Sequence, residues 1–371
     1  MEEKQGALKS TAYAFIIIIG IAVIFSILKL LAEIFIPFVI AYFLFFVFSP
    51  LNNYLEKYKI PTWATILIDI AAVLLIFASI SSLVIDSFSE FQQFLPEYER
   101  KLNSIIISTA TSMGIKDPEL TKFSIAELLA KIDYKLLAGN VFTSTFSALG
   151  SLLFVLFFFV FVVTGHNNIY LAVRKRYLSN KNESKGHPDG SEREKKKSES
   201  RDDMKVQKTF KDITNQVQRY IVTKFLISLS TGIIEGTVIW IFGVDFVIVW
   251  AVLIFLLNFI PNIGSLIGLS LPCIMLLIQT GSVPAALTLA AVLIVIDTII
   301  GNIIEPKIFG DRLGLNPLII LFSLLLWGYI WGVTGALLSV PLTAVLKIII
   351  SRSDNPNMVF INDLMSSGPK A

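Results

Sequence analysis

Two acidic residues stand inside segments of the sequence that are otherwise mostly apolar. Glu235 lies within residues 220–242, and Asp297 lies within residues 284–304. A carboxyl group in the interior of a bilayer is energetically costly, and it commonly marks the path of an ion or a solute. Such a group can alternate between a protonated and an ionised form, and the ionised form can hold a cation. Glu235 and Asp297 are therefore candidates for ion coupling; the alternative is that each is hydrogen-bonded to a neighbouring helix or faces water.

A second group of polar residues follows Asp297 closely. It consists of Asn302, Glu305 and Lys307. These side chains could extend the same path, or Glu305 and Lys307 could pair with each other in a loop.

Metal and cofactor chemistry is not predicted. Cys273 is the only cysteine and the chain has two histidines, which are too few for the ligand clusters that bind transition metals. The sequence also lacks a Walker-type phosphate loop, a His-Glu-x-x-His motif and a Gly-x-Ser-x-Gly motif. We therefore expect no catalytic residue, no metal, no cofactor and no enzymatic activity.

Two apolar stretches, residues 246–279 and 317–350, have an unusual length. Each has 34 residues, which is more than the roughly 20 needed for one crossing and too few for two crossings and a turn. A break is therefore expected in each, and in transporters such breaks commonly build the substrate or ion site. An ordinary proline kink or a long tilted helix is the alternative. The candidate break residues are Asn258, Pro261, Asn262 and Gly264 in the first stretch, and Gly332 and Gly335 in the second.

The composition indicates which elements position these residues. Of the 371 residues, 54% are hydrophobic and 16% are charged, whereas a soluble domain carries about 25% charged residues. Charged residues are absent from 136–173, 246–296 and 313–346, and each run is longer than one bilayer crossing. The sequence therefore predicts an all-α polytopic membrane protein in a lipid bilayer. We expect about eight transmembrane helices, with broken or re-entrant helices in the C-terminal half.

The predicted spans divide the chain into membrane and extramembrane segments. Residues 166–219 contain 14 Lys and Arg against 8 Asp and Glu, whereas residues 86–145 contain 6 against 8. Because basic loops stay in the cytoplasm, we expect both termini to be cytoplasmic and the protein to be a multi-pass component of the cell (inner) membrane. The expected segments are spans one to three in 1–85, extracytoplasmic amphipathic helices in 86–145, span four in 146–165, a cytoplasmic polar loop and amphipathic helix in 166–219, spans five to eight in 220–350, and a cytoplasmic tail in 351–371.

The cytoplasmic loop contains a segment with almost no apolar residues, 181–205. Such a composition predicts disorder. Its run Lys195-Lys196-Lys197 is interleaved with glutamates, which favours a solvated loop over a nucleic-acid site, so no nucleic acid is expected as a partner.

The C-terminal half resembles the autoinducer-2 exporter (AI-2E) family of membrane transporters. The resemblance rests on an ordered set of motifs: Asn258-Phe-Ile-Pro261-Asn-Ile-Gly264, Gly301-Asn302-Ile-Ile-Glu305-Pro306-Lys307, Leu315-Asn-Pro317-Leu, and Trp327-Gly followed by Gly332-Val-Thr-Gly335. It implies an integral membrane transporter that assembles as a homo-oligomer, such as a pentamer. Some members of the family are associated with export of the quorum-sensing signal autoinducer-2 and others with sodium–proton antiport. The segment 181–205 is longer and more charged than the linker usual in the family.

Three functional hypotheses follow. The first is a secondary transporter that exports a small polar solute, such as autoinducer-2 or a related metabolite, along a path that includes the two breaks and Glu305. The second is a sodium (lithium)/proton antiporter that uses Glu235 and Asp297 with a cation as its substrate. The third is a membrane scaffold without transport, against which the buried acids and the breaks argue.

Overall fold

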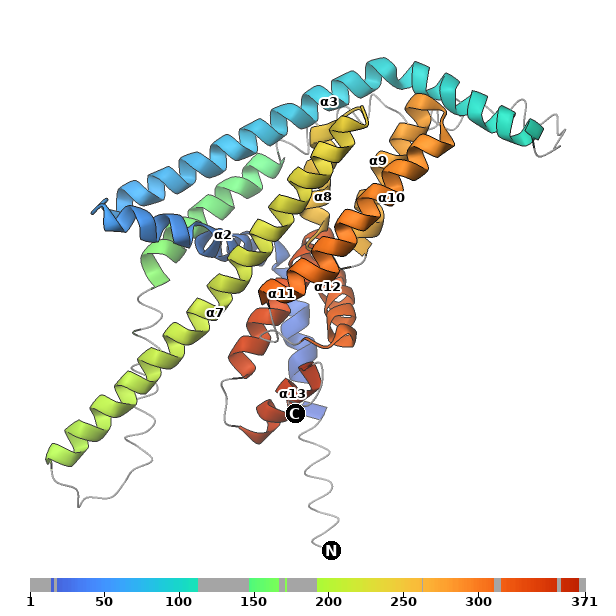
Figure 1. The fold of residues 1–371 in the computed structure, drawn as a ribbon. Helices are drawn as coiled ribbons and strands as arrows, with labels where there is room; N and C mark the ends of the chain where they lie inside the picture. The colour runs from blue at the N-terminus through green and yellow to red at the C-terminus, as the bar shows by residue number, and fades with distance from the viewer. Residues whose placement is uncertain are drawn as a thin grey trace, which may run out of the picture. The chain divides into compact units, whose positions relative to one another are not determined.

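The computed structural model describes residues 15–16, 19–112, 147–166, 171, 192–261, 263–309, 315–351 and 355–366. Regular structure in these residues is helical, apart from one isolated bridge between Leu315 and Ser366. The elements, drawn in Figure 1, are α2 (Ala32–Lys57), α3 (Thr62–Ser112), α7 (Glu192–Ile241), α8 (Val247–Leu257), α9 (Ile263–Thr280), α10 (Val283–Ile299), the π-helix η1 (Ile300–Ile304), α11 (Glu305–Phe309), α12 (Pro317–Ile350) and α13 (Pro356–Met365).

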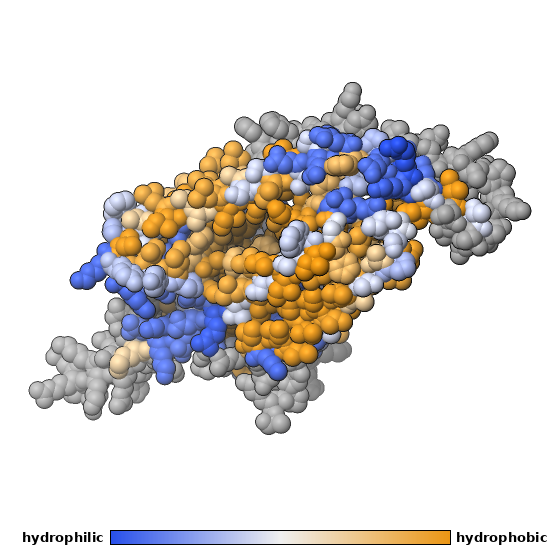
Figure 2. All heavy atoms as spheres, turned by 45° about the horizontal axis from the view of Figure 1, so that its top comes forward, coloured by the Kyte–Doolittle hydropathy of each residue, from blue (hydrophilic) through white to orange (hydrophobic). Residues whose placement is uncertain are grey.

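Several of these helices have the length and composition of membrane spans. Seven stretches of the described residues qualify: Ala32–Lys57, Thr62–Ile107, Ser147–His166, Gln207–Ile241, Ile263–Thr280, Val283–Phe309 and Pro317–Ile350. Two shorter apolar helices, Ile19–Leu30 and Val247–Leu257, accompany them. Figure 2 shows apolar atoms over much of the face in view, as expected for a surface that contacts lipid tails. The predicted all-α polytopic membrane fold is confirmed.

Helices α3 and α7 are longer than the sequence predicted. The third span was expected to end near Ile85, but α3 continues without interruption to Ser112, through Pro96. Residues 181–205 were expected to be disordered, but α7 already begins at Glu192. Residues 192–205 are rich in Glu, Lys and Arg, and the high helix propensity of these residues outweighs their inability to bury apolar area. Within the two predicted loop regions, residues 113–146, 167–170 and 172–191 lie outside the described residues.

The chain divides into two compact units. The first comprises residues 1–45, 154–210 and 314–371. Its apolar core gathers Trp327, Ile330 and Trp331 of α12 against residues of Ile19–Leu30 and α2. The indole Nε1 of Trp331 donates a hydrogen bond of 3.0 Å to the carbonyl oxygen of Leu28.

The break predicted near Gly332 is present in α12. Trp331 and Gly332 have non-helical backbone angles, and Gly332 has a φ of 62°, which glycine adopts without the penalty that a Cβ would bring. Beyond this break, Gly335 lies so close to the preceding segment that a Cβ on it would be 1.9 Å from the carbonyl oxygen of Trp327. The second half of α12 therefore packs directly on the first.

The second unit comprises residues 46–153 and 211–313. Helix α9 packs against both α8 and α10, and α3 runs across the ends of α8 and α9 (Figure 1). The hydroxyl of Tyr98 on α3 donates a 2.6 Å hydrogen bond to Asp245, which lies in the turn between α7 and α8. Tyr98, on the extended part of α3, is thus buried in the apolar core of this unit.

Candidate functional site

A stripe of four polar side chains runs along one buried face of α7. Lys224, Ser228, Thr231 and Glu235 follow one another at spacings of 4, 3 and 4 residues, which places them on the same side of a helix. Glu235 and Ser228 are 0% exposed, Thr231 is 1% exposed and Lys224 is 7% exposed. With a rise of about 1.5 Å per residue, the stripe is roughly 16 Å long.

Glycines on both sides of Glu235 let α8 approach this part of α7. A Cβ on Gly232 would lie 2.8 Å from the carbonyl oxygen of Ala251, and one on Gly236 would lie 2.8 Å from the Ala251 side chain. Such distances are shorter than packed atoms allow, so only glycine fits at either position. The close approach buries the Glu235 side chain between the two helices.

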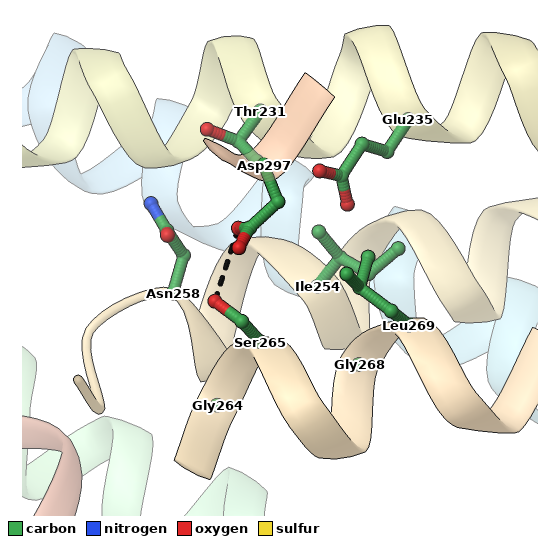
Figure 3. Close-up of a pocket in the computed structure, with 9 residues that line it drawn as sticks. All are labelled: Thr231, Glu235, Ile254, Asn258, Gly264, Ser265, Gly268, Leu269 and Asp297. Atoms are coloured by element: carbon green, nitrogen blue, oxygen red, sulfur yellow. Dashed lines mark hydrogen bonds between the residues drawn. The ribbon is translucent and has the colours of Figure 1, made fainter. Parts of the chain in front are cut away.

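A small pocket lies at the Glu235 end of the stripe (Figure 3). Helices α7, α8, α9 and α10 all contribute to it. Its lining residues are Thr231, Glu235, Ile254, Asn258, Gly264, Ser265, Gly268, Leu269 and Asp297. The volume open to the centre of a water molecule is about 10 Å³, which is close to the space that one water requires.

The predicted break at Pro261 forms one wall of the pocket. Helix α8 ends at Leu257, and α9 begins at Ile263. The two helices then pack so closely that a Cβ on Gly264 would lie 1.8 Å from the carbonyl oxygen of Leu257. Asn258, at the end of α8, donates a 3.0 Å hydrogen bond to Ser228 of the α7 stripe. The break is thus tied directly to α7.

The two acids of the pocket have different surroundings. Asp297, half-buried on α10, accepts a 3.0 Å hydrogen bond from the Ser265 hydroxyl of α9. Among the described residues, neither carboxyl oxygen of the fully buried Glu235 has a hydrogen-bond partner. Buried polar groups are nearly always hydrogen-bonded, and leaving one unpaired costs about 1–3 kcal/mol. An unpaired carboxyl group facing a water-sized pocket is therefore available to a proton, a cation or a polar group of a solute.

An ion pair occupies the other end of the stripe. The Lys224 ammonium lies 2.8 Å and 3.0 Å from the two carboxyl oxygens of Glu305. The Glu305 side chain is 26% exposed and that of Lys224 is 9% exposed. Glu305 therefore pairs with a residue 81 positions away, on another helix, and not with Lys307 in a loop, which was the alternative to a role in the path.

The structure brings together some of the predicted residues and separates others. Glu235, Asn258, Gly264 and Asp297 line one pocket. Asn302 and Lys307 are exposed and are not among the lining residues. Pro261 lies at the break without lining the pocket, Asn262 lies outside the described residues, and Gly332 and Gly335 belong to the first unit.

Four residues of this arrangement were not predicted as site residues from the sequence: Lys224, Ser228, Thr231 and Ser265. The 4-3-4 spacing of the α7 stripe could have indicated the first three, because polar residues that recur at helical spacing within an apolar helix share a face. No sequence signal distinguishes Ser265 from other serines in apolar segments. Its contact with Asp297 on α10 is evident only from the fold.

Comparisons with known proteins agree with the membrane fold and with the sequence resemblance. A sequence model of the family described as "AI-2E family transporter" matches residues 13–354. The "AI-2 transport protein TqsA" of Escherichia coli K12 is 28% identical over 344 residues, which cover 91% of this chain and 92% of that protein. A Haemophilus influenzae protein is 29% identical over 356 residues, which cover 91% of this chain and 93% of that protein. Its name states transport but no substrate.

Proposed function

This chain belongs to the AI-2E family of transporters, and we propose that it is a secondary transporter that exports a small polar solute, such as autoinducer-2 or a related metabolite. The proposed path runs along the polar stripe of α7 and through the pocket lined by Glu235, Asn258 and Asp297. The relative named for AI-2 transport supports this class of solute. No phosphate-binding motif for a nucleotide is present in the sequence, so an ion gradient or the solute's own gradient would drive export.

The observation that carries the proposal is the Glu235 carboxyl group. It is fully buried, it has no hydrogen-bond partner among the described residues, and it faces a pocket at a helix break. A purely structural acid would be paired, since an unpaired one destabilises the fold. An acid that must exchange partners during transport would instead be left free to do so.

The pocket is too small for a sugar-sized solute, so under this proposal the structure corresponds to a closed state of the transporter. A volume of about 10 Å³ for the centre of a water molecule accommodates one water or a bare ion and excludes a sugar-sized solute. Under this proposal the structure represents a closed state, and α7, α8 and α9 must separate for a solute to pass. The break between α8 and α9 supplies the place where such a movement can occur.

A second candidate function, sodium (lithium)/proton antiport, is favoured by the oxygen-rich lining of the pocket. Carboxyl and hydroxyl oxygens are contributed by Glu235, Asp297, Thr231 and Ser265. Hard cations prefer oxygen ligands, and two carboxyl groups around one small space favour either a shared proton or a bound cation.

The purified full-length protein in proteoliposomes separates these functions. Autoinducer-2 efflux without sodium-dependent proton movement supports the exporter. Sodium-dependent proton movement without autoinducer-2 efflux supports the antiporter. In a correctly folded sample, the absence of sodium-dependent proton movement and of efflux of autoinducer-2 and related small polar metabolites would contradict both proposals. We further propose that the protein is a homo-oligomer of the cell membrane with cytoplasmic termini, which cross-linking in membranes and reporter fusions at each terminus would test.

A further inference from the structure

The ion pair at the far end of the α7 stripe lies outside the pocket and is not explained by it. Lys224 and Glu305 are joined by two short contacts, 2.8 Å and 3.0 Å. One turn earlier on α7, the ring of Tyr220 contacts that of Phe309 on α11, with the ring centres 5.3 Å apart and the ring planes tilted by 40°. An ion pair and an aromatic contact thus connect the same two helices on successive turns.

A π-helix determines which way Glu305 faces. In an α-helix each residue turns the chain by about 100°, so eight residues from Asp297 to Glu305 would leave the two side chains about 80° apart. A π-turn takes up one additional residue, so the same eight residues turn the chain about as far as seven α-helical ones, which leaves about 20°. The π-helix η1 lies between the two acids. It therefore turns both acids toward α7.

The two acids consequently meet the two ends of the α7 stripe. Asp297 reaches the pocket beside Glu235, and Glu305 reaches Lys224. Between these ends lies Ser228, 0% exposed, held by Asn258 at the helix break. The ion pair therefore lies at the Glu305 end of the proposed path, with Ser228 as the next polar side chain of the stripe.

We propose that Lys224 and Glu305 form a gate at one end of the proposed path, and that the π-helix η1 sets its closed position. This partly buried ion pair holds two helices together because the buried Lys224 charge left alone would be uncompensated, and π-turns occur frequently at functional sites. Loss of the pair admits water to the stripe as far as Ser228. This inference rests on the proposed path, but the gate can be tested without any transported solute.

The test measures the accessibility of a cysteine at position 228. The full-length Cys273→Ala, Ser228→Cys protein is placed in lipid nanodiscs, and its rate of reaction with a water-soluble methanethiosulfonate reagent is measured. With the ion pair intact, we expect slow modification. Glu305→Gln should raise the rate at least tenfold, because Lys224 then loses its partner and becomes hydrated.

Two further variants make the result specific. Lys307→Gln removes an exposed charge two residues from Glu305 and should leave the rate within twofold. The charge exchange Lys224→Glu with Glu305→Lys rebuilds the pair in reverse and should restore slow modification. If Glu305→Gln aggregates, Glu305→Asp, which shortens the side chain by one methylene group, should still raise the rate at least threefold.

An unchanged rate in folded Glu305→Gln or Glu305→Asp overturns the gate, as does an equal increase in Lys307→Gln. The outcome is independent of the transport assay. A raised rate combined with normal transport by Glu235→Gln would support the gate and contradict the path assigned to the pocket. An unchanged rate in Glu305→Gln, combined with loss of transport in Glu235→Gln, would contradict the gate and support the path assigned to the pocket.

Discussion

The hydroxyl of Ser265 donates a hydrogen bond of 3.0 Å to the carboxyl group of Asp297. This bond joins the first turn of α9, directly after the helix break, to α10 (Figure 3). It orients Asp297, one of the two pocket acids. The other acid, Glu235, has no hydrogen-bond partner among the described residues. The pocket therefore has one acid fixed by the protein and one that is free to bind.

Removing that hydroxyl should weaken the pocket more than the fold. Ser265→Ala removes a hydrogen bond to a charged group, which contributes about 1.5–3 kcal/mol, and it frees Asp297 to change rotamer. We expect a modest drop in melting temperature and a transport rate reduced severalfold. Ser270→Ala is the matched control, because this hydroxyl bonds the carbonyl oxygen of Ile267 in its own helix; equal losses of transport in the two variants would contradict the role of Ser265.

The close packing at the helix break predicts a steric effect. Gly264→Ala places a methyl group 1.8 Å from the carbonyl oxygen of Leu257, and overpacking of this kind costs about 1–3 kcal/mol. We expect a lower melting temperature in detergent and reduced transport. Gly301→Ala, where nothing lies within 4 Å of the new methyl group, should not lower the melting temperature measurably, and a similar loss there would argue against the packing explanation.

A hydrogen bond from Tyr98 ties the extended part of α3 to the turn between α7 and α8. Tyr98→Phe removes the 2.6 Å contact with Asp245 while keeping the buried ring. The loss should destabilise the second unit by about 1–3 kcal/mol and raise hydrogen exchange in residues 86–112. Tyr54→Phe removes a hydroxyl contact between two exposed tyrosines, and it should change neither quantity.

The π-helix can be tested by shortening it. Deleting Ile303 removes the additional residue of η1, so seven residues of continuous α-helix join Asp297 to Glu305, and Glu305 keeps its direction toward α7. The rate of modification at position 228 should then stay as slow as with the ion pair intact. Deleting Ile304 as well removes one α-helical residue, turns Glu305 by about 100° away from α7 and should raise the rate as Glu305→Gln does; a raised rate in the single deletion would separate the π-helix from the gate.

The membrane architecture could be predicted from the sequence because bilayer thickness imposes a length on every span. Both helix breaks were also predictable: apolar stretches of 34 residues fit neither one crossing nor two. The beginning of α7 was not predicted, since composition alone does not show whether a charged segment extends a neighbouring helix. The uninterrupted α3 was missed because the change from apolar to amphipathic sequence after Ile85 suggested a boundary.

The candidate site was predictable only in part. Buried acids are conspicuous in apolar segments, so Glu235 and Asp297 could be named from the sequence, but their convergence on one pocket depends on how α7 and α10 pack. The partner of Glu305 could not be found by inspecting its neighbours, because Lys224 lies 81 residues away. The π-helix that brings them together has no recognisable sequence signal.

The central claim is that transport depends on the unpaired Glu235 carboxyl group. The most direct measurement is autoinducer-2 accumulation in everted membrane vesicles that contain wild-type protein, Glu235→Gln or the exposed control Glu90→Gln. Because Glu235 has no hydrogen bond to lose among the described residues, Glu235→Gln should fold with an unchanged or higher melting temperature. We predict at least a tenfold loss of accumulation in Glu235→Gln and wild-type accumulation in Glu90→Gln. Wild-type accumulation in folded Glu235→Gln would contradict the account.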